Sequence, residues 1–98
     1  MLDKLTLESF QPHLNQKFTI HAQPGVEIES VLKACEGLGT GPERGRARQF
    51  RLLFLGPLQP IFPQRIYRVE NREFGSVEMF LVPIGPQDGG MRYEAVFT

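Results

Sequence analysis

The sequence predicts a mainly β protein with one domain over residues 1–98, in which a single antiparallel meander of about six strands forms a curved sheet or a small barrel. Three observations support this prediction. Apolar residues recur at every second position in several short segments. Glycine and proline separate these segments, and no gap between them holds a convincing crossover helix, which a parallel sheet would need. The length also suits a single domain with a thin core.

A short helical segment, 6–15, is expected before the first strand. Its apolar residues fall on one side of a helical wheel: Leu7, Phe10 and Leu14. Thr6 is a suitable N-cap residue. Pro12 disfavours helical geometry at the residue before it and clashes one turn back, so we expect only one or two helical turns.

Six strands are expected after this segment. Their ranges are about 17–23, 26–35, 49–55, 65–70, 76–82 and 91–97. Between the first two, Pro24 and Gly25 predict a tight turn. We expect Pro83 and Pro86 to end the fifth strand, and Gly89-Gly90 to permit the turn into the sixth.

The third and fifth strands are apolar on both faces, which is their most informative feature. Besides their core-facing residues, they carry Leu53 and Leu55, and Phe80 and Val82, on the second face. A second apolar face also needs cover. The helical segment 6–15 is one source of this cover, and a partner chain is the other.

Charge and cysteine content exclude several classes of protein. Eleven basic and eleven acidic residues give a formal net charge of zero, so no global field attracts nucleic acid or a membrane. Cys35 is the single cysteine, which excludes an intrachain disulfide and suits a reducing compartment. The N-terminus lacks the pattern of a secretory signal, and no apolar run is long enough to span a bilayer. We therefore expect a cytoplasmic protein without a membrane partner.

No group of residues predicts catalysis. Cys35, His13 and His21 are types found in Cys–His nucleophile pairs, but their spacing does not bring them together and is not that of a zinc site. Glu27 and Glu29 lie on one strand face, as two solvated glutamates commonly do. We expect no catalytic residue, no metal and no cofactor.

The segment 56–64 is the better candidate for an interaction site. Three prolines stiffen it, and between them lie the apolar residues Leu58, Ile61 and Phe62. A stiff loop loses little entropy on docking, so it could present these side chains to a protein partner. The alternative is that they cover the end of the core.

Arginines in the segment 37–48 and just after it form the one basic cluster: Arg44, Arg46, Arg48 and Arg51. Guanidinium groups at every second residue could meet phosphates along one edge. Aromatic residues among them are few, and the acidic Glu36 and Glu43 flank the segment. A solvated loop is the alternative to nucleic-acid binding, which we consider an unlikely function.

Several stretches of the chain also carry a family resemblance. The most specific are Val-Pro-Ile-Gly-Pro at 82–86 and Gly-Met-Arg-Tyr-Glu-Ala-Val-Phe at 90–97, with further similarity at 5–10, 50–57, 63–64 and 67–70. Together they resemble a family of uncharacterised bacterial proteins of about this length, whose members are encoded near phage-tail-like or tail-collar proteins. The resemblance implies a structural or accessory role and carries no catalytic residues.

These observations favour a non-catalytic structural, accessory or protein-interaction module that binds a protein partner or forms a homo-oligomer. A phage-tail-like assembly is the context that the resemblance implies. The alternative is a small-ligand-binding β-barrel or a minor enzyme, which would need an enclosed pocket with convergent polar groups. The residues to watch for such a pocket are Arg68, Arg92, Tyr93 and Glu94.

Overall fold

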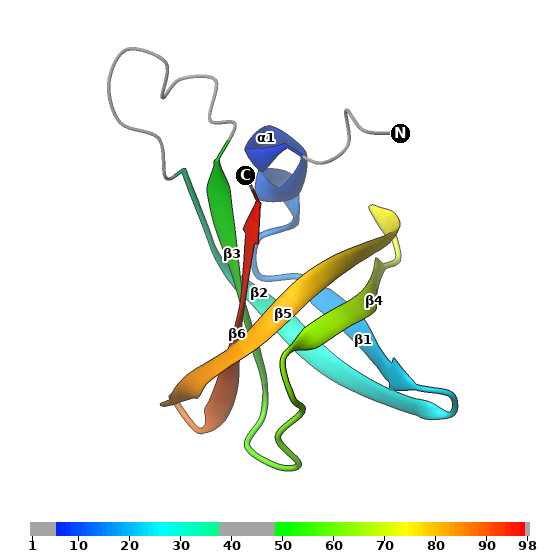
Figure 1. Ribbon diagram of the computed structural model, residues 1–98. Coiled ribbons are helices and arrows are strands. Elements are labelled where there is room, and N and C mark those ends of the chain that lie inside the picture. Colours follow the sequence, from blue (N-terminus) through cyan, green and yellow to red (C-terminus); the bar gives the residue numbers. More distant parts are fainter. Residues whose placement is uncertain (1–5, 38–48, 98) are drawn as a thin grey trace.

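A computed structural model of the chain describes residues 6–37 and 49–97. Two short helical elements come first, α1 (Leu7–Phe10) and the 3-10 helix η2 (Gln11–His13). The strands follow as β1 (Lys17–Gln23), β2 (Val26–Gly37), β3 (Phe50–Pro57), β4 (Arg65–Asn71), β5 (Gly75–Gln87) and β6 (Gly90–Phe97). The arrangement is drawn in Figure 1.

The six strands close into a small barrel in the order β1-β2-β3-β6-β5-β4, with every neighbouring pair antiparallel. The closed strand order confirms the predicted fold class. Of the two predicted forms, it is the small barrel and not the curved sheet. The path is a meander within each half of the chain. Between the halves β3 pairs with β6 along its whole length, from Phe50↔Phe97 to Pro57↔Gly90, instead of with β4. The connection from β3 to β4 therefore passes across one end of the barrel (Figure 1).

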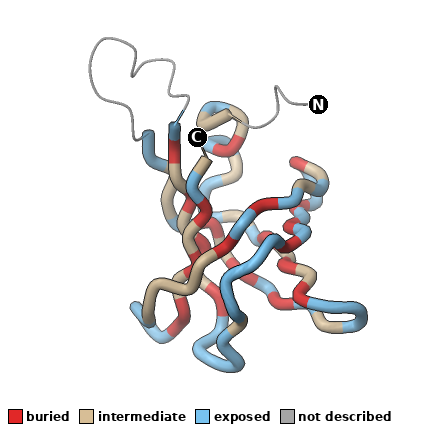
Figure 2. Tube along the Cα trace, in the orientation of Figure 1, coloured by how far each residue is buried: buried red, intermediate tan, exposed pale blue. Residues whose placement is uncertain are grey.

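Alternating side chains fill the inside of the barrel. Figure 2 shows buried positions recurring along each strand between exposed ones. Apart from glycines, the buried strand residues are Phe18, Ile20, Ala22, Ile28, Ser30, Leu32, Phe50, Leu52, Phe54, Tyr67, Val69, Asn71, Met79, Leu81, Met91, Tyr93 and Ala95. Each large apolar side chain among them contributes roughly 1.5–3 kcal/mol by leaving water.

The N-terminal segment closes one end of this barrel. Thr6 caps α1 through a reciprocal pair of bonds with Ser9, in which each side-chain oxygen accepts from the other residue's backbone N–H. The helical turns end at His13, close to the predicted end. Phe10 is fully buried at the barrel end, whereas Leu14 remains 42 % exposed. This segment was one of the two sources considered for covering an outer strand face, and its Phe10 instead plugs the interior.

The prediction that Pro83 and Pro86 end the fifth strand is wrong, because β5 continues through both to Gln87. The pairing with β4 ends at Arg65↔Leu81, so the later part of β5 pairs only with β6. Proline lacks an N–H and is tolerated where a strand has one free edge. The turn into β6 is made by Asp88 and Gly89, both with positive φ, as in a two-residue type I′ hairpin.

Candidate interaction surface

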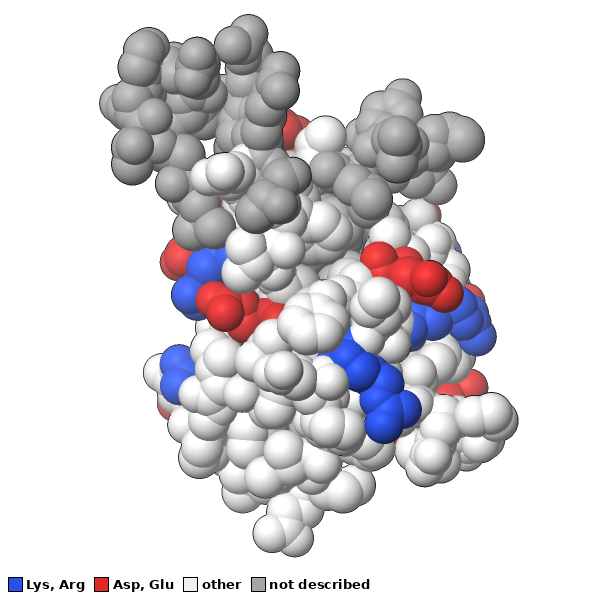
Figure 3. Space-filling view, viewed as in Figure 1, with Lys and Arg blue, Asp and Glu red and all other residues white. Residues whose placement is uncertain are grey.

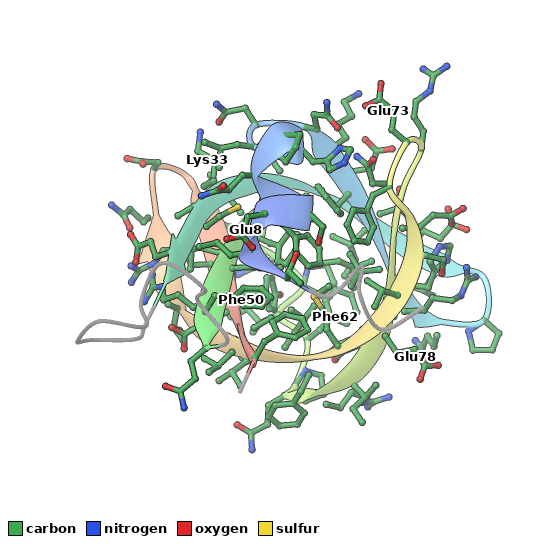
Figure 4. All side chains as sticks on the ribbon, turned by 90° about the horizontal axis from the view of Figure 1, so that it is seen from above. Glu8, Lys33, Phe50, Phe62, Glu73 and Glu78 are labelled. Atoms are coloured by element: carbon green, nitrogen blue, oxygen red, sulfur yellow. The ribbon has the colours of Figure 1, made fainter. Side chains whose placement is uncertain are left out.

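The loop between β3 and β4, residues 58–64, lies at the end of the barrel opposite α1 (Figure 1). Phe62 is partly buried against the core, and its side chain points into the barrel in Figure 4. The Phe62 N–H donates to the Tyr93 hydroxyl at 3.2 Å, and the Tyr67 hydroxyl donates to the Pro63 carbonyl at 2.5 Å. Two core tyrosines thus hold this loop, which we call the proline loop, from inside.

The two other apolar residues of the proline loop face solvent. Leu58 is 46 % exposed and Ile61 is 55 % exposed. The three candidate residues therefore differ. Phe62 covers the end of the core, which was the alternative to docking, whereas Leu58 and Ile61 lie at the surface. A loop pinned by two hydrogen bonds and stiffened by proline loses little conformational entropy when its exposed residues dock.

Burial also raises the pKa of the Tyr67 hydroxyl, with Tyr93 adding to the effect and the charge of Arg65 opposing it. The hydroxyl therefore keeps its proton through neutral pH. A protonated Tyr67 can donate to the Pro63 carbonyl, so the anchor of the proline loop does not titrate under physiological conditions.

A second exposed apolar group lies on the outside of β4 and β5. Ile66 and Phe80 are directly opposite each other in the register, and they are 63 % and 49 % exposed. Arg68 and Glu78 form the next outward-facing pair along the same strands. Figure 3 shows that residues other than Lys, Arg, Asp and Glu cover most of the lower part of the visible face, where the proline loop and the lower end of β5 lie.

The outer side of β1 is polar instead. Thr19 lies between Glu29 of β2 and Glu70 of β4, and these residues line a groove of about 760 Å³. Lys17 and Arg72 also line it, so the groove carries charges of both signs. The sequence did not predict this groove, because three separate chain segments form it.

Glu27 and Glu29 are both exposed on this polar side and each has an ion-pair partner. Glu27 lies 3.5 Å from the ring of His21, and Glu29 lies 3.8 Å from Lys17. The other ring nitrogen of His21 lies 2.9 Å from Glu70. The two glutamates therefore belong to a surface charge network, as the solvated interpretation expected.

The Cys–His pair considered from the sequence does not form with His21. Cys35 lies on β2 eight residues beyond Glu27, the cross-strand neighbour of His21, which separates them by about 26 Å along the strand. His13 is held in η2, where a ring nitrogen lies 2.9 Å from Gln16 Oε1. Within the described parts of the chain, no three metal-binding side chains form a group that could hold an ion.

We expect Cys35 to react slowly with thiol reagents in the folded protein. Burial raises the pKa of its thiol from 9.0 to about 11, so the thiolate population at pH 8 falls about a hundredfold. A disulfide reagent at pH 8 should therefore label native protein about a hundredfold more slowly than protein unfolded in urea. Equal rates would contradict the burial of the thiol.

The same pKa shift affects stability at high pH. Because the folded-state pKa lies above the unfolded-state value, the unfolded chain loses its proton first. The contribution of Cys35 to the free energy of unfolding should be intact below pH 9 and disappear between pH 9 and about 11. Cys35→Ala removes this part of the pH dependence, which urea titrations across that range would measure.

Three of the four clustered arginines, Arg44, Arg46 and Arg48, lie outside the described residues. Arg51 is described and sits between two carboxylates, 3.3 Å from Glu36 and 2.9 Å from Glu94. Its charge is therefore already compensated within the barrel wall, which leaves Arg51 poorly suited to bind a phosphate.

The residues watched for a ligand pocket do not converge. Tyr93 points inward and is nearly fully buried, while Arg68 pairs outside with Glu70 at 3.6 Å. Arg92 donates to the backbone carbonyls of Ile84 and Gly85, and Glu94 bonds Arg51. The inward side chains that the structure describes, such as Leu52 and Phe54, are buried in the core where a ligand would have to bind.

The apolar pair on β4 and β5 was only half predicted. The apolar pattern on both faces of its strand identifies Phe80 as a residue that needs cover, whereas it does not identify Ile66. The sequence signal was present, since Ile66 is out of phase with the inward-facing Tyr67 and Val69. Only the register shows that Ile66 and Phe80 are neighbours.

Comparisons with known proteins give one match. A family model described as a domain of unknown function (DUF6916) matches residues 5–97, which is nearly the entire chain. No curated protein and no solved structure matches. Within the described residues, no helix has the length and apolar character needed to cross a membrane.

Proposed function

We propose that this chain, which belongs to the DUF6916 family, is a non-catalytic protein-interaction module that serves as an accessory part of a larger assembly. The observation that carries the proposal is the proline loop. Its exposed residues, Leu58 and Ile61, stand on a backbone held by Tyr67 and Tyr93. A rigid apolar projection of this kind is suited to fill a pocket on another protein.

The class of partner comes from the sequence resemblance. The resemblance described from the sequence implies genes encoded near phage-tail-like proteins, so the partner that we propose for the proline loop is a structural protein of a phage-tail-like particle. The cluster of buried inward side chains favours a role for the outer surface rather than for a ligand-binding interior.

Replacing both exposed residues of the loop tests the proposal. Leu58→Asp/Ile61→Asp should remove the apolar projection and introduce two charges that a complementary apolar pocket cannot solvate. In its own cell, tagged wild-type chain should co-purify with a structural protein of a tail-like particle, identified by mass spectrometry. The double variant should recover at least about tenfold less of it, which corresponds to roughly 1.4 kcal/mol.

Val96→Asp is the matched control, because Val96 is 50 % exposed on β6 and lies outside the proline loop. This variant should keep the partner. Recovery of no tail-like structural protein with the wild-type chain, or equal recovery with the loop variant, would refute the proposed function.

A further inference from the structure

The outward side of β4 and β5 has an ordered pattern of side chains. The register sets Ile66 opposite Phe80, then Arg68 opposite Glu78, then Glu70 opposite Ser76. The residues between them point inward, and Tyr67, Val69 and Met79 are buried in the core. We call the six outward residues the β4–β5 face. Its apolar pair lies at one end, and its charged pair lies immediately beside it.

This face leaves polar and apolar groups without internal partners. Ile66 and Phe80 are each about half exposed or more, and two large apolar neighbours of this kind favour a cover. Glu78 points away from the barrel in Figure 4, and the described residues offer it no ion pair within 4.0 Å. Arg68 is half exposed. Among the described residues, its ion pair is the one between its Nη1 and Glu70 Oε1, at 3.6 Å.

We propose that the β4–β5 face binds the same face of a second copy of this chain, forming a two-fold symmetric dimer. A two-fold axis lying in the interface, parallel to the strands and midway between β4 and β5, exchanges the two strands between copies. Each residue of β4 then faces the residue that is its own cross-strand neighbour on β5. The register makes the face compatible with this symmetry.

The residues brought together by this axis are complementary. Ile66 of one copy covers Phe80 of the other, and Arg68 meets Glu78, with each contact made twice. Glu70 faces Ser76, so no two like charges oppose each other. The chain has no formal net charge, and two copies therefore approach without long-range repulsion. A partner of different sequence would have to supply this same pattern.

The size of the face sets the expected strength of the dimer. Six residues a side is well below the roughly 20–30 residues of a standard stable interface. Association is therefore expected to be weak and concentration-dependent, with the apolar pair contributing most and the charged pair setting the orientation. This dimer uses residues other than Leu58 and Ile61 of the proline loop, so it adds to the proposed function without depending on it.

Sedimentation velocity over a concentration series tests the dimer. Wild-type chain should shift from monomer to dimer as concentration rises. Phe80→Glu should weaken association at least tenfold, because it places two carboxylates in the apolar cluster at one end of the interface. Leu14→Glu is the matched control, since Leu14 is similarly exposed near the barrel end that α1 closes, and it should dimerise like the wild type.

Charge reversal tests the orientation. Arg68→Glu opposes carboxylates on both copies, and Glu78→Arg opposes guanidinium groups, so each variant alone should dimerise about tenfold less well than wild type. Mixing the two variants should restore dimerisation, because every carboxylate of one then faces a guanidinium of the other. Circular dichroism of each variant checks that the barrel is folded.

Three results would overturn the dimer: a wild-type monomer at every concentration, a dimer unaffected by Phe80→Glu, or no recovery on mixing the charge variants. These outcomes are distinguishable from failure of the proposed function. Phe80→Glu retains Leu58 and Ile61, so capture of a tail-like structural protein by this variant reports on the proline loop alone.

Discussion

Phe10→Ala is expected to lower the free energy of unfolding by about 3–5 kcal/mol, a large part of the stability of a domain of this size. Phe10 is fully buried at the barrel end. Its ring stacks on Phe74 at 4.5 Å between centroids and contacts Phe50 and Phe97 at 6.0 Å each. Truncation removes the plug and leaves a cavity lined by three aromatic rings, which the closed barrel cannot collapse to fill.

Urea denaturation followed by circular dichroism measures this loss. Leu14→Ala is the matched control, because Leu14 belongs to the same N-terminal segment and is 42 % exposed. It should change the free energy of unfolding by no more than about 0.5 kcal/mol. A loss below about 1 kcal/mol for Phe10→Ala would mean that the segment does not close the barrel as described.

Asn71→Ala is expected to lower the free energy of unfolding by about 2–4 kcal/mol, because one buried side chain makes four hydrogen bonds. Its amide nitrogen donates to the Lys17 carbonyl at 2.9 Å and to Gln16 Oε1 at 3.2 Å. Its oxygen accepts from the backbone N–H groups of Glu73 and Phe74 at 2.9 and 2.7 Å. Asn71 therefore builds the β4–β5 turn and ties it to the start of β1.

Thermal and urea unfolding measure the effect, with Arg72→Ala as the control. Arg72 is the next residue and is exposed, so its loss should cost no more than about 0.5 kcal/mol. Asn71→Asp separates the two roles. It keeps the acceptor for the turn but replaces the donor with an oxygen that faces two other oxygens, so it should also be destabilising. If Asn71→Asp were as stable as wild type, the hydrogen bonds from Asn71 to β1 and Gln16 would contribute nothing to stability.

The sequence predicts strands well where apolar and polar residues alternate regularly. Phe18, Ile20 and Ala22 are all inward-facing on β1, as expected. The proline rule is wrong for the second half of β5, which continues through Pro83 and Pro86. The sequence cannot show that β4 has already ended beside that part of β5, and a free edge is what makes Pro83 and Pro86 acceptable there.

The candidate surfaces were predicted only in part. Leu58, Ile61 and Phe62 were chosen together from their setting among prolines, yet Tyr93 and the core draw Phe62 inward and leave the other two outside. The pairing of Ile66 with Phe80 depends on a register between two strands. Register is set by the turn and by burial on the inner face, neither of which a single strand's sequence contains.

By itself the sequence determined what each short segment becomes: six extended strands with alternating faces, tight glycine turns, and a capped helical turn at the start. These are local properties, because side-chain direction along a strand and cap chemistry depend on residues within a few positions. The tertiary structure alone decided that β3 joins β6, that Phe10 closes the barrel end, and that Ile66 and Phe80 lie side by side. Those outcomes depend on joining the strands into one closed barrel and filling one shared interior, and both conditions involve the entire chain at once.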